Sequence, residues 1–223
     1  MSTAPKTGSA AARAYSWVRE RILDGTYPAG RLLSEGEISE ALEISRTPVR
    51  EAFLQLAVEE MLELYPKRGA LVVPVTATEL MEVMAARSLI EPWAARTLAL
   101  RLDRETVIPV LRELIAGAQL ALSERDDQRF QELDREFHER IVIAAGNRLL
   151  AQFYSSLRDR QHRAVHLAFA VAERRGTEIT GEHEAIADAL ATGDGALAGA
   201  LLSGHLEHTT ALLGLGPVQG LSQ

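Results

Sequence analysis

The chain has 223 residues, of which 47% are hydrophobic and 25% are charged, and its formal net charge is −7. This is ordinary globular composition, sufficient for one large domain or two smaller ones, and it excludes an intrinsically disordered chain. Cysteine is absent, which excludes disulfides, thiolate metal ligands and thiol nucleophiles.

Membrane and nucleic-acid partners are constrained by the distribution of apolar and charged residues. No apolar run approaches the roughly 18 residues that a membrane span needs, so we expect a cytoplasmic protein with no membrane partner. An acidic chain is unusual for a protein that binds DNA. Residues 1–75, however, are nearly balanced, with 9 Lys and Arg against 10 Asp and Glu, whereas the remainder carries 15 against 21. Any DNA affinity of the first part must therefore come from where its arginines point.

The first part of the chain begins with two predicted helices. Residues 1–10 are expected to form a flexible tail, and apolar residues recur at helical spacing over residues 11–24. Ser34 is the predicted N-cap of a second helix, and Glu37, three residues later, completes a capping box. Two short helices in this order are typical of the start of a helix-turn-helix.

A third helix and a hairpin follow. The apolar stripe of the third helix runs over residues 46–61, and two β-like runs over 62–65 and 70–75 flank a turn at Gly69. Together with the first two helices, these elements predict a winged helix-turn-helix domain over residues 11–75.

The rest of the chain is helical in pattern and almost free of strand signals. The predicted helices span residues 77–101, 103–125, 127–145, 147–170, 177–192 and 194–213. The break between the fourth and fifth is placed at Arg175–Gly176, and Pro92 and Pro109 are expected to kink the first and the second. The predicted fold class is therefore mostly α, with a winged helix-turn-helix followed by an all-α six-helix bundle over residues 76–214 and a tail over 215–223.

The third helix has the pattern of a DNA-reading helix. Such a helix carries cationic or polar side chains in its first turns, because that end enters the major groove. Arg46 and Arg50 are four residues apart and share a face, from which Arg can bond bidentately to guanine, while Thr47 can reach a phosphate or a thymine methyl. The candidate DNA-binding residues are Ser45, Arg46, Thr47 and Arg50 of this helix, and Lys67, Arg68 and Gly69 of the wing. Taken alone, the arginines could also be solvated helix charges.

Four residues of the second part could hold a metal ion. Asp134 and His138 are four residues apart on one predicted helix, which puts a carboxylate and an imidazole on one face. His183 and His205 lie on two later helices. Three His and one Asp without Cys suit a divalent ion such as zinc, nickel or manganese, and zinc is the metal that we expect first. By spacing alone, capped or solvated histidines are the commoner explanation.

Other polar side chains could take part in ligand binding. Arg87 lies four residues before Glu91, so it could either clamp the carboxylate of a ligand through a bidentate pair or form only an intrahelical ion pair with Glu91. His162 and His166 could line the pocket for such a ligand, or they could lie on a solvated face.

The motif LLSEGEISEALEISRTPVREAFLQL, followed by PKRGALVVPVT, resembles the N-terminal domain of GntR-type bacterial transcription regulators. The resemblance implies that Arg46 and Arg50 read an operator and that the wing tip contains Arg68. Gly36 departs from the pattern, because some members have a DNA-contacting Arg there. Glu43 and Glu60 also depart from it, since glycine is common at both places; the first adds a negative charge near DNA.

The segment from about residue 80 to residue 213 resembles the FCD-type helical effector domain of FadR-like GntR regulators, specifically the metal-binding VanR-type subgroup. The resemblance is carried by DREFHERIVIAAGN, by the Glu-His pair at 182–183 and by the first His of SGHLEH. It implies that Asp134, His138, His183 and His205 bind a metal that helps to hold a small carboxylic-acid effector, with Arg87 facing the cavity. It further implies a homodimeric repressor that binds double-stranded operator DNA and is released by its effector.

A metal-dependent enzyme on a helical bundle is the alternative. A di-iron carboxylate protein needs two Glu-x-x-His motifs and a zinc hydrolase needs His-Glu-x-x-His; the sequence has neither. We therefore expect no enzyme activity. A pure interaction module without DNA binding would leave the SRTPVREA helix unexplained.

Overall fold

The computed structural model describes residues 9–215, apart from the side chains of residue 156 and of residues 158–175. The chain divides into two compact units between Val75 and Thr76. Most of the two expected tails lies outside the described residues, and so do the side chains of His162 and His166.

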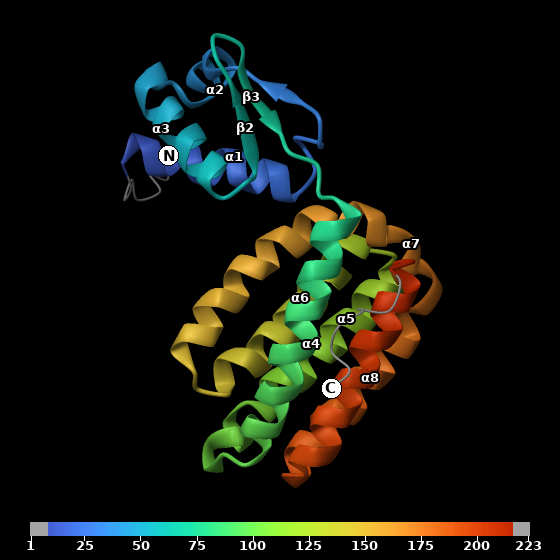
Figure 1. Cartoon of the computed structure of the whole chain (residues 1–223). Helices are drawn as coiled ribbons and strands as arrows, with labels where there is room; N and C mark the ends of the chain where they lie inside the picture. The colour runs from blue at the N-terminus through green and yellow to red at the C-terminus, as the bar shows by residue number, and fades with distance from the viewer. Residues whose placement is uncertain (1–8, 216–223) are drawn as a thin grey trace, which may run out of the picture. The chain divides into compact units, whose positions relative to one another are not determined.

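The first unit contains helices and a small antiparallel sheet (Figure 1). Its elements are α1 (Ala10–Leu23), β1 (Leu32–Leu33), α2 (Glu35–Leu42), α3 (Arg46–Val58), β2 (Leu62–Tyr65) and β3 (Gly69–Val72). The strand order is β1-β3-β2, so β3 pairs with both of its neighbours. The three helices and the hairpin agree with the prediction, whereas β1 was not foreseen because a two-residue run is too short to show alternation.

Local chemistry explains where α2 begins. The Ser34 side chain accepts a hydrogen bond from the backbone N–H of Glu37 at 3.0 Å, as an N-cap should. The Glu37 carboxylate lies 2.6 Å from Arg31. Glu37 thus forms an ion pair in place of the hydrogen bond that a capping box would have between its side chain and the backbone N–H of Ser34. The helices and the sheet enclose one apolar core, whose largest fully buried members are Leu33, Ile38, Phe53 and Leu56.

The wing turn depends on Gly69. Its φ is +120°, and a Cβ at this position would lie 2.0 Å from the carbonyl oxygen of Leu33, so the two backbone segments can approach only where the side chain is absent. Lys67 also has a positive φ, of 64°. This turn leaves Lys67 and Arg68 exposed at the tip of the hairpin.

Helices joined by short connections make up the described part of the second unit, which contains no strand (Figure 1). Its elements are α4 (Ala77–Ala99), the 3-10 helix η1 (Leu102–Thr106), α5 (Ile108–Glu124), α6 (Asp127–Ala144), α7 (Arg148–Thr192) and α8 (Gly195–Leu212). Its core includes Leu98, Leu111, Phe137, Ile186 and Leu202. The mostly α fold class is confirmed. In the described part of the chain, no helix combines the length and apolarity needed to cross a membrane.

Three details of the helix prediction are wrong. The helix predicted over 103–125 is divided into the 3-10 helix η1 and α5, so the described part of the second unit has five α-helices and one 3-10 helix where six helices were predicted. The helices predicted over 147–170 and 177–192 form one helix, α7, which continues through Gly176. A Cβ on Gly176 would lie 2.2 Å from Leu122 Cδ2, so this glycine allows close packing against α5 and does not end a helix. Pro109 lies in the first turn of α5, where its missing N–H costs nothing. It therefore marks the start of that helix, whereas the sequence predicted a kink inside it.

Candidate DNA interface and metal centre

Helix α3 buries one face and exposes the other. Val49, Phe53 and Leu56 are in the core, while Arg46 and Arg50 are exposed on the opposite face. Ser45 is at the N-cap position, but its side chain makes no capping hydrogen bond. Ser45 and Thr47 are exposed as well. The first turns of α3 therefore present polar groups to solvent, as the sequence predicts.

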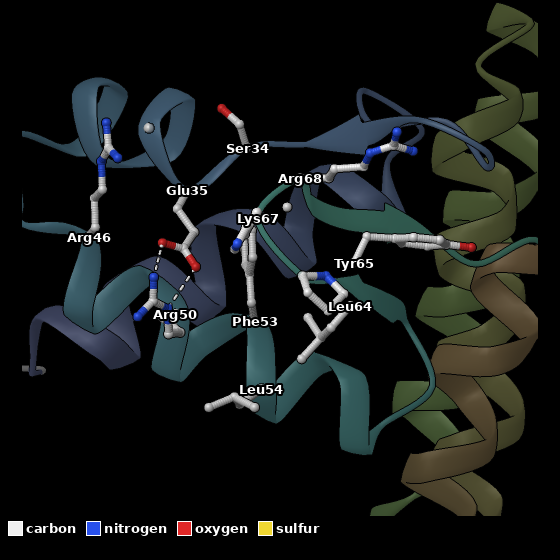
Figure 2. Close-up of a pocket in the computed structure, with 13 residues that line it drawn as sticks. Ser34, Glu35, Arg46, Arg50, Phe53, Leu54, Leu64, Tyr65, Lys67 and Arg68 are labelled. Atoms are coloured by element: carbon white, nitrogen blue, oxygen red, sulfur yellow. Dashed lines mark hydrogen bonds and ion pairs between the residues drawn. The ribbon is translucent and has the colours of Figure 1, made fainter.

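A groove of about 630 Å³ lies between the start of α2, the exposed face of α3 and the wing (Figure 2). Its cationic lining residues are Arg46, Arg50, Lys67 and Arg68. Gly69 also lines it. Glu35 is the one carboxylate among the described residues of this lining. The structure therefore brings five of the seven candidate DNA-binding residues into one electropositive groove, which suits a phosphate backbone.

Arg50 is held by a residue that the sequence analysis did not identify. Its Nε and Nη2 donate hydrogen bonds of 2.8 Å to the two carboxylate oxygens of Glu35 (Figure 2). The hydrogen bonds from Arg50 lower the pKa of the Glu35 carboxyl. The two residues are 15 positions apart, and no spacing rule pairs such residues, so the sequence carries no signal for this contact.

At Glu43 and Glu60 the side chain departs from the GntR pattern, but the backbone has a conformation that suits the usual glycine. Glu43 and Glu60 have φ of 53° and 57°, so both adopt the left-handed conformation that glycine favours. Each carries a strain of roughly 1 kcal/mol for having a Cβ there. A Cβ on Gly36 would have Arg46 Nη2 as its nearest neighbour, at 3.6 Å, which is ordinary van der Waals contact.

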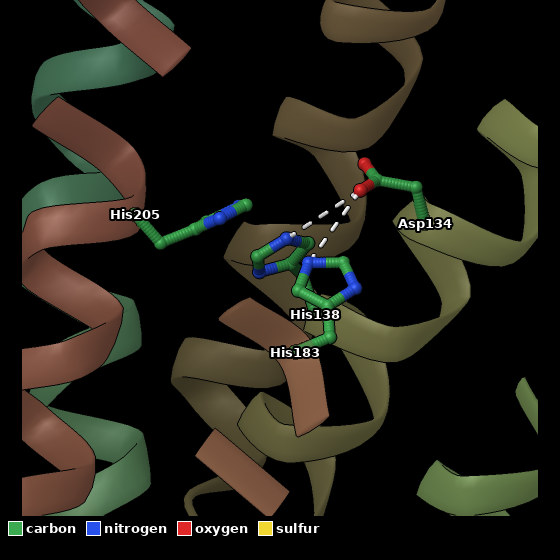
Figure 3. A group of neighbouring side chains, drawn as sticks. All are labelled: Asp134, His138, His183 and His205. Carbon is green, nitrogen blue, oxygen red and sulfur yellow. Dashed lines mark ion pairs between the residues drawn. The ribbon is translucent and has the colours of Figure 1, made fainter. Parts of the chain in front are cut away.

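The candidate metal ligands come from three helices and meet inside the second unit (Figure 3). Helix α6 supplies Asp134 and His138, α7 supplies His183, and α8 supplies His205. One potential ligand atom from each residue lies within 4.8 Å of the others. Asp134 Oδ1 is 3.6 Å from His183 Nε2 and 4.0 Å from His138 Nε2. The histidines are buried and the aspartate is partly exposed.

The donor set fits a divalent ion. The Nε2 atoms of His138 and His183 are buried without a hydrogen-bond partner among the described residues, which costs free energy unless a ligand satisfies them. Burial, followed by the nearby His205 and His138, holds the pKa of His183 well below its usual 6.5. Burial also lowers the pKa of His205, against the opposing effect of Glu182. Neutral imidazoles have the lone pairs that a metal needs, and ligand distances of about 2 Å require only small side-chain shifts from this arrangement.

Arg87 forms the ion pair that the sequence allowed. Its Nε donates to Glu91 Oε1 at 2.5 Å, and both side chains are buried. The Tyr154 hydroxyl donates to the same oxygen at 2.6 Å. Burial alone would raise the pKa of Glu91, but Arg87 and then His138 outweigh it and hold the pKa well below its usual range.

Two carboxylates lie against the histidines of the metal group. His138 Nδ1 is 2.6 Å from Glu91 Oε2, although its N–H is not aligned with that oxygen. His205 Nδ1 is hydrogen-bonded to Glu182 at 2.7 Å, and the exposed His208 shares Glu182 at 3.0 Å. The hydrogen bond with His205 is the main cause that lowers the pKa of Glu182 to about 2. The sequence indicates Glu91 only as a partner of Arg87, and no motif signals Glu182 as a partner of His205.

Two family profiles match the chain. The profile of bacterial regulatory proteins of the gntR family covers residues 10–72. The FCD domain profile covers residues 82–208, which is more than half of the chain. The first range contains the groove residues, and the second contains all four candidate metal ligands.

Individual relatives and solved structures are similar to most of the chain. The chain is 28% identical over 184 residues to the gluconate operon transcriptional repressor of Bacillus subtilis (strain 168), covering 81% of this chain and 75% of that protein. It is 28% identical over 155 residues to the transcriptional repressor RspR of Escherichia coli (strain K12), covering 70% and 68%. Among solved structures, a GntR regulator from Rhodococcus sp. RHA1 has a TM-score of 0.78 at 27% identity, over 92% of this chain and 98% of that one. E. coli McbR/YncC has the same TM-score at 22% identity, covering 93% and 98%, and so supports the fold.

Proposed function

Because the chain belongs to the GntR family of bacterial transcription regulators and carries an FCD domain, we propose that a small carboxylic-acid effector, bound with a divalent metal in its helical unit, controls operator binding by its winged unit. The protein is a transcription regulator and not an enzyme. As a repressor it would occupy operator DNA in the cytoplasm, and the effector would release it. The relative named for the gluconate operon makes gluconate a suitable first carboxylate to test.

The observation that supports this proposal is the buried cluster of Asp134, His138, His183 and His205. An Asp and three neutral His from three helices would provide the ligands of a divalent ion. Zinc suits this ligand set best, with nickel or manganese as alternatives. When bound, the metal would supply a positive charge that attracts an effector carboxylate into the bundle.

Metal binding and effector response can be tested together. Purified wild-type protein should retain one divalent ion per chain. After this ion is removed, a zinc concentration of 100 times the Kd should add about 2.7 kcal/mol of stability to the metal-free protein in a thermal-shift measurement. The His138→Ala and His205→Ala variants should lose both the metal and the effector response. If both variants kept full metal content and full response, the proposal would be abandoned.

Arg87 is the proposed effector-binding residue. In this structure the Nε of Arg87 donates to Glu91 Oε1, and its Nη1 lies 3.9 Å from the Met84 sulfur. The terminal guanidinium nitrogens are the ones that would meet an effector carboxylate. The ion pair and the effector contact would then exist together, with Glu91 holding the arginine in place.

For DNA, we propose that Arg46, Thr47 and Arg50 contact base edges in the major groove. The groove position of Lys67, Arg68 and Gly69 suits phosphate or minor-groove contacts. We further propose a phosphate contact for Ser45, which is exposed at the start of α3.

We also propose that the protein acts as a homodimer, because helix-turn-helix proteins read two-fold operators as two-fold dimers. The second unit exposes large apolar side chains on α4, at its C-cap and at the start of α7, among them Leu89, Trp93, Leu100, Leu149 and Phe153. Trp93 and Leu149 line one shallow depression. An exposed apolar surface of this kind is a candidate subunit interface.

A further inference from the structure

Two of the three buried histidines have a carboxylate on the ring nitrogen that faces away from the candidate metal position. Glu91 Oε2 is 2.6 Å from His138 Nδ1, and Glu182 Oε2 is 2.7 Å from His205 Nδ1. The Nε2 of His138 lies toward Asp134, at 4.0 Å from its Oδ1. Figure 3 shows His205 directed toward the same centre. The carboxylates come from α4 and α7, so neither is a helical neighbour of the histidine that it contacts.

This arrangement decides which ring nitrogen carries the proton. A neutral histidine has one N–H and one lone pair, and a carboxylate beside Nδ1 accepts only from a protonated Nδ1. The lone pair is then on Nε2, which faces the other ligands. The same contact fixes the ring orientation and makes the ligating nitrogen more basic.

We propose that Glu91 and Glu182 are positioning residues of the metal centre, each holding one histidine in the tautomer and orientation that bind the ion. This inference rests on the proposed function, because it presupposes a metal at the Asp134 cluster. Neither carboxylate is itself a ligand: each acts through the histidine that it contacts.

The two positioning residues differ in what else they hold. Glu91 is completely buried, and its other oxygen accepts from Arg87 and from Tyr154. It therefore connects a metal ligand with the proposed effector arginine in one network. Glu182 has a side chain that is 28% exposed, and its other oxygen contacts the exposed His208. Glu182 can therefore be changed without leaving an unpaired charge in the core.

The primary test is zinc affinity of the full-length protein, measured by competition with a chelator. Glu182→Gln should weaken zinc binding about 10- to 100-fold relative to the wild type. Glu184→Gln is the matched control, because Glu184 is exposed two residues away on the same helix and contacts Gln119. The control should bind zinc as the wild type does.

Histidine tautomers provide a readout that does not depend on bound metal. Long-range ¹H–¹⁵N NMR spectra of the metal-free wild type should show His138 and His205 protonated at Nδ1. In Glu182→Gln the His205 signals should change toward mixed tautomers, while those of His138 stay as they are. Wild-type zinc affinity in Glu182→Gln, or Nε2-protonated rings in the metal-free wild type, would overturn the inference.

Two further variants test the positioning role of Glu91. Glu91→Gln should lower zinc affinity at least as much as Glu182→Gln, and circular dichroism will show whether it folds. Tyr154→Phe keeps the carboxylate and its charge but removes one hydrogen bond to it, so it should fold and weaken zinc binding by only a few-fold. A wild-type protein that binds no divalent ion would contradict the proposed function itself, whereas zinc-binding wild type with unaffected variants would contradict only the positioning roles.

Discussion

Two of the Arg–Glu ion pairs lie in very different surroundings, Arg50 with Glu35 and Arg87 with Glu91. In the winged unit, the Arg50 and Glu35 side chains are 67% and 24% exposed. In the helical unit, those of Arg87 and Glu91 are 3% and 0% exposed. Exposed ion pairs contribute little to stability, and their charges can exchange one partner for another at small cost. A buried pair is part of the core, because loss of either partner leaves an uncompensated charge.

This difference matches the proposed roles of the two units. Arg50 must be able to exchange Glu35 for a base or a phosphate when DNA arrives, so a weak, solvated pair is suitable. Arg87 and Glu91 lie beside a proposed metal centre whose geometry must already exist before a ligand binds. The first pair therefore belongs to an exchangeable surface and the second to a preorganised site.

The largest expected effect comes from breaking the buried pair. Arg87→Ala should lower the free energy of unfolding by about 3–5 kcal/mol, since it leaves the Glu91 carboxylate buried with less compensation. Urea denaturation of the metal-free protein would measure this. The control is Arg112→Ala, which removes an exposed pair with Asp188 in the same unit and should cost less than about 1 kcal/mol. Equal losses of unfolding free energy in the two variants would show that the buried and the exposed pair contribute alike to stability.

The next effect concerns the exposed arginine. Arg50→Ala should reduce operator affinity roughly 10- to 100-fold and relax base preference, because a bidentate contact to guanine discriminates strongly. Its effect on unfolding should be small. Fluorescence anisotropy at fixed salt, with operator and with scrambled DNA, measures both affinity and preference. Unchanged operator affinity would remove α3 from the proposed interface.

The buried histidines make stability depend on pH. The folded state keeps His183 and His205 neutral through lowered pKa values, whereas the unfolded chain binds protons near the ordinary pKa of about 6.5. Stability of the metal-free protein should therefore be full above this pH and should fall as pH drops below it, by at most about 1.4 kcal/mol per pH unit for each histidine. The midpoints of urea denaturation at pH 8, 7, 6 and 5 test whether stability falls as the pH is lowered. A His183→Gln variant should show a shallower decline, and an equally steep one would argue against this cause.

The smallest effect is expected from the partner of Arg50. Glu35→Gln should leave unfolding nearly unchanged and should reduce discrimination between operator and single-mismatch DNA by roughly two- to fivefold, because Arg50 loses the carboxylate that orients it. The same anisotropy assay applies. Discrimination equal to that of the wild type would show that this pair has no role in reading DNA.

The sequence predicted elements well where the signal was local. Periodicity, the Ser34 cap and the glycine turn at Gly69 were sufficient for α2, α3 and the hairpin. The i, i+4 spacing of Asp134 and His138 placed two metal-site residues on one face of α6. Joining these to residues on α7 and α8 required the family resemblance, because spacing cannot show which helices pack together.

Contacts between distant segments were the ones missed. Glu35 with Arg50, and Glu182 with His205, depend on how helices pack, and no local pattern encodes them. Gly176 was misinterpreted for the same reason, since a glycine that ends a helix and one that allows close packing against Leu122 look alike in sequence. The departures Glu43 and Glu60 were detectable as residues, but their left-handed conformations became visible only in the structure.

The central claim is that the metal centre of the helical unit controls the DNA surface of the winged unit. Its most direct test is operator affinity, measured by anisotropy on DNA selected from a random pool, with gluconate and other small carboxylates added to zinc-loaded and zinc-free protein. We predict that an active carboxylate weakens operator binding by the zinc-loaded wild type, and has no effect on zinc-free protein or on His138→Ala. The same response in all three proteins would contradict this account.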